Sequence, residues 1–324
     1  MELESNAERS GLGGIESMGL GDEIMASGQV KEAYENLPED CQIVLGRPVR
    51  NEAGKLTQII RKQDNRDAAI IFQNNPKLTT NVNWHKKIHF IESFPGSRPY
   101  IINKGPLHDR QRCNFNWDFK AIPGEIFFNS QEKQRIKELK QQFSNYILLN
   151  PVTINGFCED NKNWGASKWL SLAEMLHSKG YKTIQTLYGS GHDGEILNVN
   201  GTVINPRLPD TFGIKTRSFR DMLCVIAACS FSITTEGAVH HAAAALGKKS
   251  VVILGGRVPP SILGYDFHSN FYVEEVTLDN GEKVQSPCGE HHRCEHCRIC
   301  MEKISAEDVF SEAERLANEL NQGS

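Results

Sequence analysis

The most regular hydrophobic pattern of the chain lies between residues 231 and 256. A β-branched run at 232–235 is followed by a Glu-Gly turn and four alanines at 242–245, and Gly247 precedes a second apolar run at 250–254. Apolar runs with so few polar interruptions are typical of parallel strands that are buried on both faces. The pattern therefore predicts a strand, a helix and a second strand, parallel to the first.

The turn at 236–240, between the first strand and the helix, has the properties of an anion site. Ligands of open α/β sheets bind outside the carboxyl ends of the strands, and free N–H groups at the start of a helix attract phosphate. Gly237 lets a ligand come close to the backbone. We expect a phosphate group to bind beside Gly237 and Ala238.

The same patterns predict elements on both sides of this unit. In the C-terminal half we expect strands at 146–149 and 182–188, helices at 167–179 and 217–229, an irregular connection at 195–215 and a final helix from residue 305. In the N-terminal half we expect a helix that ends near residue 37, strands at 42–45, 68–72, 86–91 and 100–102, and a helix that begins at the capping box of Asn129 and Glu132. This alternation predicts an α/β fold with Rossmann-like units.

Composition narrows the class of protein. A length of 324 residues favours about two domains, and 39% hydrophobic with 23% charged residues is ordinary for a soluble globular protein. The formal charge of −4 argues against a broad nucleic-acid-binding surface. We expect neither a signal peptide nor a membrane span, because the amino terminus is acidic and no long apolar run exists. Nine cysteines, an odd count, fit a reducing compartment, so we expect a cytoplasmic protein.

A glycine cluster precedes the first expected helix and ends in Gly21 and Asp22. Its spacing is not the G-x-G-x-x-G of dinucleotide-binding loops. Aspartate at the start of a helix is a favoured capping residue. A cap is therefore one interpretation of Asp22, and a catalytic carboxylate is another; the two do not exclude each other.

Three segments together resemble glycosyltransferase family 9, the heptosyltransferase-like enzymes. They are the turn at 235–237 with its Ala-rich helix, the Lys-x-Trp at 162–164 before a helix, and the Gly-Asp at 21–22. The family's turn usually carries Asp-Thr-Gly where this chain has Thr-Glu-Gly, and its Lys-Arg-Trp-Pro stands here as Lys-Asn-Trp-Gly. The resemblance covers residues 145–305 well and 15–40 thinly.

The resemblance implies a GT-B architecture, in which two Rossmann-like domains face each other across a cleft. Residues 1–142 would form the acceptor-side domain, 143–304 the domain that binds the nucleotide sugar, and 305–324 a C-terminal helix. It implies that Asp22 is the base that activates the acceptor. The donor-binding residues would be Thr153, Lys162, Ser190, Glu236, Gly237, Ala238 and His240.

The implied reaction moves a sugar from a nucleotide-diphosphate sugar to a hydroxyl group, with inversion and without a catalytic metal ion. Lipopolysaccharide core is the family's usual acceptor, so a glycan or lipid-linked acceptor and a peripheral membrane contact are expected. A sugar-nucleotide epimerase of the same architecture and a non-catalytic, metal-stapled binding protein remain alternatives. For Lys162 the alternative is an ordinary surface lysine, for Trp164 a packing anchor, and for His240 a partly buried histidine.

Basic residues gather between residues 74 and 125, among them His85, Lys86, Lys87 and His89. One interpretation is an acceptor surface for an anionic partner. The other, which we favour, is a solvated loop surface, because charged residues are mostly exposed for solubility alone.

Four cysteines lie close together at positions 288, 294, 297 and 300. Cys288, Cys294, Cys297 and Cys300 could close a structural zinc site or hold an iron–sulfur cluster, and the neighbouring histidines could replace one thiolate. Three ligands within seven residues are cramped around one zinc ion, so a metal-free cluster is the alternative. We expect no catalytic role for a metal here.

Overall fold

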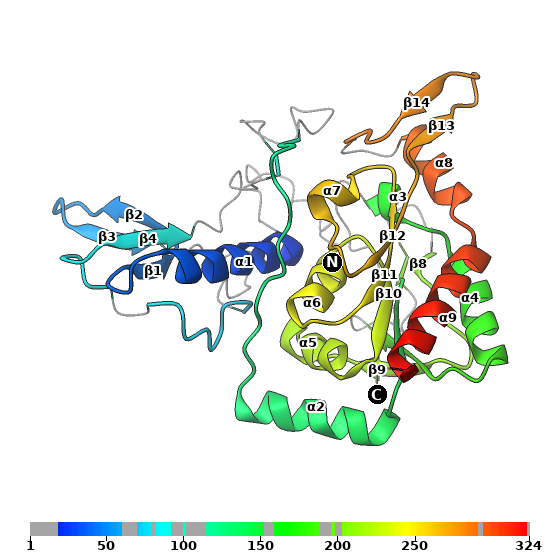
Figure 1. Ribbon diagram of the computed structural model, residues 1–324, viewed down its shortest axis with the longest axis horizontal. Helices are drawn as coiled ribbons and strands as arrows, with labels where there is room; N and C mark the ends of the chain where they lie inside the picture. The colour runs from blue at the N-terminus through cyan, green and yellow to red at the C-terminus, as the bar shows by residue number, and fades with distance from the viewer. Residues whose placement is uncertain are drawn as a thin grey trace, which may run out of the picture.

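The computed structural model describes residues 19–59, 70–79, 82–91, 100–101, 115–151, 159–187, 196–197, 203–290 and 294–322. Its centre is a six-stranded sheet in the C-terminal half, in which every neighbouring pair is parallel (Figure 1). From one edge to the other, the strands are β12 (Ser269–Tyr272), β11 (Ser250–Gly255), β10 (Phe231–Thr235), β5 (Ile147–Asn150), β6 (Thr183–Leu187) and β9 (Phe212–Lys215). The α/β class with a Rossmann-like parallel sheet is therefore confirmed.

The order of these strands locates a binding crevice. Along the chain, β5 is the first strand of the sheet; the chain then builds outward through β6 and β9, and returns to the other side of β5 through β10, β11 and β12. The strand order reverses between β5 and β10, and open α/β sheets bind ligands at the carboxyl ends of the strands at such a point. Asn150 ends β5 and Thr235 ends β10.

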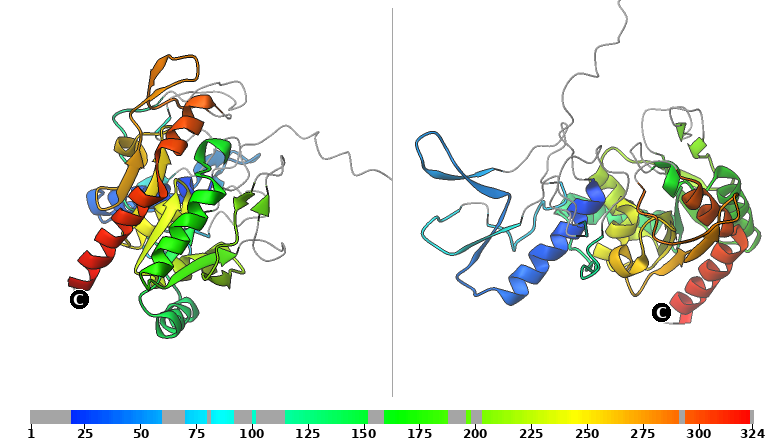
Figure 2. Two further views of the ribbon diagram at one scale, coloured as in Figure 1. Left: turned by 90° about the vertical axis from the view of Figure 1, so that its right-hand side faces the viewer. Right: turned by 90° about the horizontal axis from the view of Figure 1, so that it is seen from above.

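Helices cover both faces of the sheet. On one face lie α4 (Ala166–Ser178) and α9 (Ala306–Gln322), which the left view of Figure 2 shows side by side. Their apolar stripes bury Trp169, Leu172 and Leu316 against the sheet. Each such side chain contributes about 1.5–3 kcal/mol when it leaves water. The other face carries α5 (Phe219–Ala228) and α6 (Ala238–Ala245).

The N-terminal part packs onto that second face through α1 (Leu20–Asn36). The amino-terminal part of this helix packs against α6, whose alanines leave room for it (Figure 1). Ile24 and Val30 of α1 belong to the same buried cluster as Val239 and Ala243 of α6. Beyond α1 lie the parallel pair of β1 (Gln42–Leu45) and β4 (Ile88–Ile91) and the antiparallel pair of β2 (Arg47–Arg50) and β3 (Leu56–Ile59). The start of α1 is thereby fixed beside the sheet's helices.

The remaining elements connect these parts. They are α2 (Ser130–Phe143), α3 (Glu159–Lys162), β7 (Ile196–Leu197), β8 (Val203–Asn205), α7 (Pro260–Leu263), β13 (Glu275–Thr277), β14 (Lys283–Gln285) and α8 (Glu295–Lys303). Helix α2 has the expected capping box, since Asn129 Oδ1 accepts from Glu132 N at 2.9 Å. Arg220 ties α2 to α5 by donating to both Glu132 oxygens at 2.7 and 2.6 Å. No helix in the described ranges has the length and hydropathy that a membrane span needs.

Most expected elements are confirmed, and three expectations in the loops are wrong. The described part of 68–72 forms a turn that continues to Asn74 instead of a strand. Ile101 makes only an isolated bridge to Phe115. The connection at 195–215 is not irregular, because it contains β7, β8 and the edge strand β9. The division into domains at residue 143 stays a prediction.

Candidate functional site

The turn after β10 is the centre of the site at the crevice. Glu236 directly follows β10, and its carboxylate forms an ion pair with the ammonium of Lys162, the last residue of α3. On the other side, His241 Nε2 lies 3.8 Å from Glu236 Oε1. The Glu236 side chain is 9% exposed and that of Lys162 24%. The structure thus brings Lys162 to the turn at 236–237, and the role of both in donor binding stays a prediction.

The charge of Glu236 depends on these neighbours. Burial by itself would raise the pKa of this carboxyl, but the Lys162 ammonium and the nearby His241 outweigh burial and hold the pKa well below its ordinary value of 4.5. The imidazole of His241 also meets the Tyr265 hydroxyl, with 2.8 Å between Nδ1 and the oxygen. Glu236 is therefore an ionised carboxylate fixed between a cation and a histidine.

The start of α6 offers backbone N–H groups to a ligand. No side chain caps this helix within the part of the chain that the structure describes. A Cβ added to Gly237 would meet no described heavy atom within 4 Å, so open space lies beside the turn. Free N–H groups and open space are what an anion needs at a helix start. Gly237 and Ala238 thus stand where a phosphate could reach the backbone.

The start of α1 lies against the start of α6. A Cβ added to Gly21 would come within 2.9 Å of His241 Cδ2 and 3.6 Å of Ala238 N. A larger residue at Gly21 would therefore push the two helix starts apart. Asp22, the next residue, is consequently close to the turn that carries Gly237.

Asp22 is held by two hydrogen bonds from different parts of the chain. Its Oδ2 accepts from the N–H of Gly19 at 3.3 Å, and its Oδ1 accepts from the hydroxyl of Tyr100 at 2.8 Å. Asp22 is not the N-cap residue that the sequence offered as one interpretation, because Gly19 is the N-cap of α1 and Asp22 is the third helical residue, whose carboxylate bonds back to the N–H of the cap. The second bond, from Tyr100, fixes the direction of the carboxylate, which a catalytic base also needs.

His240 lies below the site instead of lining it. Its ring is fully buried, and neither ring nitrogen has a hydrogen-bond partner among the described residues. Burial, together with the neighbouring His241 and His268, holds the pKa of His240 well below its ordinary value, so the ring is neutral. The expected contact between His240 and a donor stays a prediction, and His241 makes the polar contacts at the turn.

Two expected donor-binding residues, Thr153 and Ser190, lie outside the described residues. Of the basic segment, the described Lys86, Lys87 and His89 form no hydrogen bond or ion pair with the site residues, while most of its other members lie outside the described residues. Trp164 is a packing anchor, because its ring is 2% exposed and its Nε1 donates to Ile304 O at 2.9 Å.

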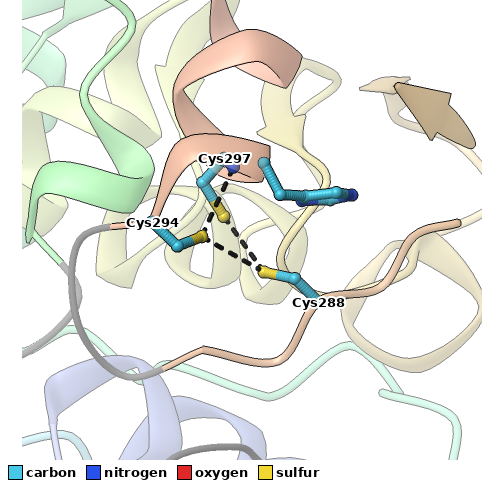
Figure 3. Close-up of side chains that lie close together, drawn as sticks. Cys288, Cys294 and Cys297 are labelled. Carbon is cyan, nitrogen blue, oxygen red and sulfur yellow. Dashed lines mark hydrogen bonds between the residues drawn. The ribbon is translucent and has the colours of Figure 1, made fainter. Parts of the chain in front are cut away.

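The cysteine cluster forms beside the carboxyl end of β11. The side chains of Cys288, Cys294 and Cys297 point toward one another (Figure 3). The Sγ of Cys288 lies 3.8 Å from that of Cys294 and 3.2 Å from that of Cys297. His296 completes a group whose ligand atoms all lie within 4.8 Å of one another. Zn–S bonds of about 2.3 Å place tetrahedral thiolates at such separations, so these residues fit a metal ion.

The observed group differs from the expected set of four cysteines. Cys300 Sγ lies against the His296 ring, at 3.7 Å from Nδ1, and against the Ser286 hydroxyl. Cys297 and Cys300 share one face of α8, but Cys297 lies in the first turn, near the loop that carries Cys288, and Cys300 lies one turn further along the helix. Hydrogen bonds from Cys288 and Cys297 lower the pKa of Cys294, so this thiol is the readiest to become a thiolate.

Two residues of the site escaped the sequence analysis. His241 stands in the same run as His240, but only the helical phase of α6 shows which of the two faces Glu236. Tyr100 meets Asp22 through a long-range contact, for which the sequence carries no local signal.

Comparisons with known proteins agree with this picture. Residues 108–274 match the sequence model of glycosyltransferase family 9 (heptosyltransferase). A search of curated protein sequences gave no match.

Three solved structures illustrate the structural likeness. The ADP-heptose LPS heptosyltransferase II of E. coli has 18% identity and a TM-score of 0.42, over 61% of this chain and 55% of that one. A family 9 glycosyl transferase from Veillonella parvula has 14% identity and a TM-score of 0.41, over 62% and 55% of the two chains. The dodecameric, iron-containing heptosyltransferase TibC of enterotoxigenic E. coli, solved with ADP-D-β-D-heptose, has 15% identity and a TM-score of 0.38, over 54% and 46%.

The chain spans about half the length of these solved structures. The family match itself includes the sheet from β5 to β12 and the turn with Glu236 and Gly237, and it agrees with the GT-B architecture that the sequence predicted. The family match covers more than half of the 324 residues, and the chain therefore belongs to glycosyltransferase family 9, the heptosyltransferase family.

Proposed function

We propose that the protein is a glycosyltransferase that moves a sugar from a nucleotide-diphosphate sugar to a hydroxyl group, with inversion at the anomeric carbon. Membership of the family supports the reaction class. The site at the strand-order reversal supports a nucleotide donor, because dinucleotides and mononucleotides bind there in Rossmann-like sheets. A glycan, such as a part of lipopolysaccharide, is the proposed acceptor. The described cysteines form no disulfide, which supports the proposal that the protein acts in a reducing compartment such as the cytoplasm.

One observation carries the proposal most strongly. The starts of α1 and α6 meet at Gly21 and Ala238, although the two helices are far apart in the sequence. This contact puts a carboxylate, Asp22, next to a helix start that can hold a diphosphate. A transfer reaction needs a base for the acceptor and a cradle for the leaving group within one site.

The chemistry follows from these two groups. Asp22 takes the proton of the acceptor hydroxyl while the acceptor oxygen forms a bond to the anomeric carbon. The bond from that carbon to the diphosphate oxygen breaks, and the diphosphate leaves with the electron pair. Lys162 and the N–H groups at Gly237 and Ala238 stabilise its negative charge. The donor approaches from one side and the acceptor from the other, so the anomeric configuration inverts.

The Lys162–Glu236 ion pair is compatible with this role. An ammonium has three N–H donors, so Lys162 can keep its bond to Glu236 and still donate to a phosphate oxygen. Glu236 in turn can accept hydrogen bonds from the ribose hydroxyls of the donor. The ion pair thus presents a lysine that is already held at the crevice.

A thermal-shift screen over nucleotide sugars and nucleoside diphosphates tests the proposal. A ligand that binds only the folded state increases the free energy of unfolding, by about 2.7 kcal/mol at a ligand concentration of a hundred times Kd. The melting temperature rises accordingly. We expect ADP- or other nucleotide-linked sugars to raise the melting temperature and simple sugars to leave it unchanged. Gly237→Val, which fills the open space beside the turn, serves as the matched variant and should remove the shift. If no nucleotide raises the melting temperature, the proposal fails.

A non-catalytic binding protein is the second candidate. It is favoured by the fact that Lys162 already has a carboxylate partner within the chain. Product analysis distinguishes the two functions, because a transferase converts donor and acceptor to a new glycoside and a nucleoside diphosphate. A binding protein would leave both unchanged at any concentration, and an epimerase would change the donor without an acceptor.

We further propose that Cys288, Cys294, His296 and Cys297 hold a structural metal ion. Thiolate and imidazole ligands suit zinc, and iron bound by thiolates is the second choice. When bound, the ion cross-links the loop before α8 to the helix. The reacting groups Asp22 and Lys162 are not among its ligands, which fits catalysis without a metal ion.

A further inference from the structure

Helix α3 connects the cysteine cluster to the proposed donor site. Its last residue, Lys162, pairs with Glu236, while the preceding residue, Asn161, contacts the loop that carries the cysteines. The Oδ1 atom of Asn161 accepts from the N–H of Cys294 at 3.1 Å, and its Nδ2 donates to Glu290 O at 3.2 Å. Asn161 is 1% exposed. Its amide is therefore clamped on both sides by the cysteine loop.

The cysteine loop is itself fixed to the end of β11. The N–H of Cys288 donates to Gly256 O at 3.1 Å and that of Gly289 to Arg257 O at 3.2 Å. Arg257 Nε donates to Glu290 O at 2.9 Å. Glu290 O thus accepts hydrogen bonds from both Arg257 and Asn161. These bonds fix the position of α3 relative to the end of β11, the strand next to β10.

Helix α3 is too short to hold its own position. It has four residues, Glu159–Lys162, and an isolated helix of one turn is unstable in water. Its neighbours therefore decide where Lys162 stands. The contact through Asn161 is one of them, and its geometry depends on how well the loop around Cys294 is ordered.

A metal ion would order that loop. The three thiols lie close together, and backbone N–H groups orient two of them: Cys297 N donates to Cys294 Sγ at 3.4 Å and Glu290 N to Cys288 Sγ at 3.5 Å. A cation shared by the four ligands would fix Cys294 and the backbone N–H that Asn161 accepts from. Once the metal ion has ordered the loop, the donor site loses less conformational entropy when it binds a diphosphate.

We propose that a thiophilic divalent metal ion in the cysteine cluster raises the affinity of the donor site for a diphosphate, and that Asn161 transmits this effect as the positioning residue of Lys162. This inference rests on the proposed function. It adds that donor binding is coupled to metal binding, so the cysteine cluster would affect the affinity of the donor site as well as the stability of the fold.

Coupling of this kind is reciprocal. If the metal ion tightens ADP binding by some factor, ADP must tighten metal binding by the same factor. Typical couplings are about 5- to 150-fold. Because reciprocity holds for any mechanism of coupling, the discriminating measurement is the loss of both factors in Asn161→Ala, which a general effect of zinc on folding would leave in place.

The experiment uses the full chain, a reductant, Zn²⁺ and ADP. Calorimetry gives the Kd of ADP for the zinc-loaded and the chelator-treated protein, and competition with a zinc dye gives the Kd of Zn²⁺ with and without ADP. We expect the zinc-loaded protein to bind ADP at least about fivefold more tightly, and ADP to tighten zinc by an equal factor. In Asn161→Ala, both factors should fall to nearly one while zinc and ADP still bind.

Two further variants keep the test decisive. Asn161→Asp retains an oxygen for the N–H of Cys294 and loses the donor to Glu290, so it should keep part of the coupling even if Asn161→Ala does not fold. Asn163→Ala is the matched control in the same segment, since Asn163 accepts a hydrogen bond from Gly165 N and not from the loop that carries the cysteines. It should keep the full coupling.

The outcomes separate this inference from the proposed function. If ADP binds equally with and without zinc, or if Asn161→Ala keeps the coupling, the inference is overturned while the donor site stands. If ADP binds neither form of the protein, the proposed function itself fails.

Discussion

Lys162 and Glu236 form a partly buried ion pair at the point where the strand order of the sheet reverses. One residue ends α3 and the other follows β10, so the pair joins two segments on either side of the crevice. The ammonium therefore stands beside the start of α6 before any ligand arrives. The pair also places a negative charge where a diphosphate is proposed to bind.

Glu236→Gln should strengthen the binding of pyrophosphate, because it removes this negative charge and leaves Lys162 free to donate to the anion. The expected gain is about tenfold or more, the scale of one hydrogen bond to a charged group. Calorimetry with pyrophosphate measures it, and ADP serves for comparison, since loss of the proposed ribose contact offsets the gain. Weaker pyrophosphate binding would show that Glu236 supports the anion site.

The same variant should be less stable at neutral pH. Breaking a buried ion pair costs about 3–5 kcal/mol, and we expect about 2–3 kcal/mol here because Lys162 is partly exposed. The pKa of Glu236 is lowered in the folded protein, so its contribution is complete above the ordinary value of 4.5 and is lost as the pH falls through the folded-state pKa. Urea unfolding should thus show a constant difference from pH 7 to about 5 that shrinks below it. A difference that grows in acid would contradict this.

Asp22→Asn should abolish sugar transfer and leave ADP binding within about twofold of the wild type. The amide cannot take a proton from the acceptor, while it keeps an oxygen for the Tyr100 hydroxyl. A transfer assay and calorimetry on the same sample measure the two effects. Asp40→Asn, at an exposed position after α1, is the control. Unchanged turnover would remove Asp22 from the mechanism.

Tyr100→Phe should lower kcat by about fivefold and leave the KM for the donor unchanged. The hydroxyl of Tyr100 donates to Asp22 Oδ1 at 2.8 Å, and one hydrogen bond contributes about 1 kcal/mol. Steady-state kinetics separates the two constants. Tyr34→Phe is the control, because it makes the same change at a residue of α1 that is 58% exposed, and it should change neither kcat nor KM. A rise in KM alone would indicate that Tyr100 binds the donor.

The elements around the site could be predicted because their signals are local. The unit from β10 to β11 shows its apolar runs, its glycine turn and its alanine helix within 25 consecutive positions or so. The capping box of α2 is also local. Edge strand β9 was missed because Gly213 and Lys215 interrupt its apolar residues and only Ile214 is buried, so the sequence lacks the apolar run that marks a central strand.

The contacts within the site could not be predicted, because they depend on the tertiary fold. The sequence showed that the acid of the turn is displaced to Glu236, but not that Lys162 reaches it. It offered four cysteines as metal ligands, whereas the start of α8 decides that His296 joins Cys297. The bond from Tyr100 to Asp22 has no counterpart in any local pattern.

Removal of metal should destabilise the protein. We expect the purified protein to contain about one zinc or iron ion per chain, and a chelator to lower its melting temperature by several degrees. Cys297→Ser removes a buried ligand and should lose the metal. Cys41→Ser changes a cysteine outside the cluster and should keep it. Full stability of Cys297→Ser, without metal, would support a metal-free cluster.

The most direct test of the donor site is the affinity of Lys162→Ala for ADP, measured by calorimetry beside Lys133→Ala on the outer surface of α2. Loss of one charged donor to a phosphate costs about 1.5–3 kcal/mol, so the account predicts that Lys162→Ala binds ADP about 10- to 100-fold more weakly while Lys133→Ala binds it like the wild type. Equal affinity of Lys162→Ala and the wild type would contradict the claim that Lys162 and the start of α6 hold a diphosphate.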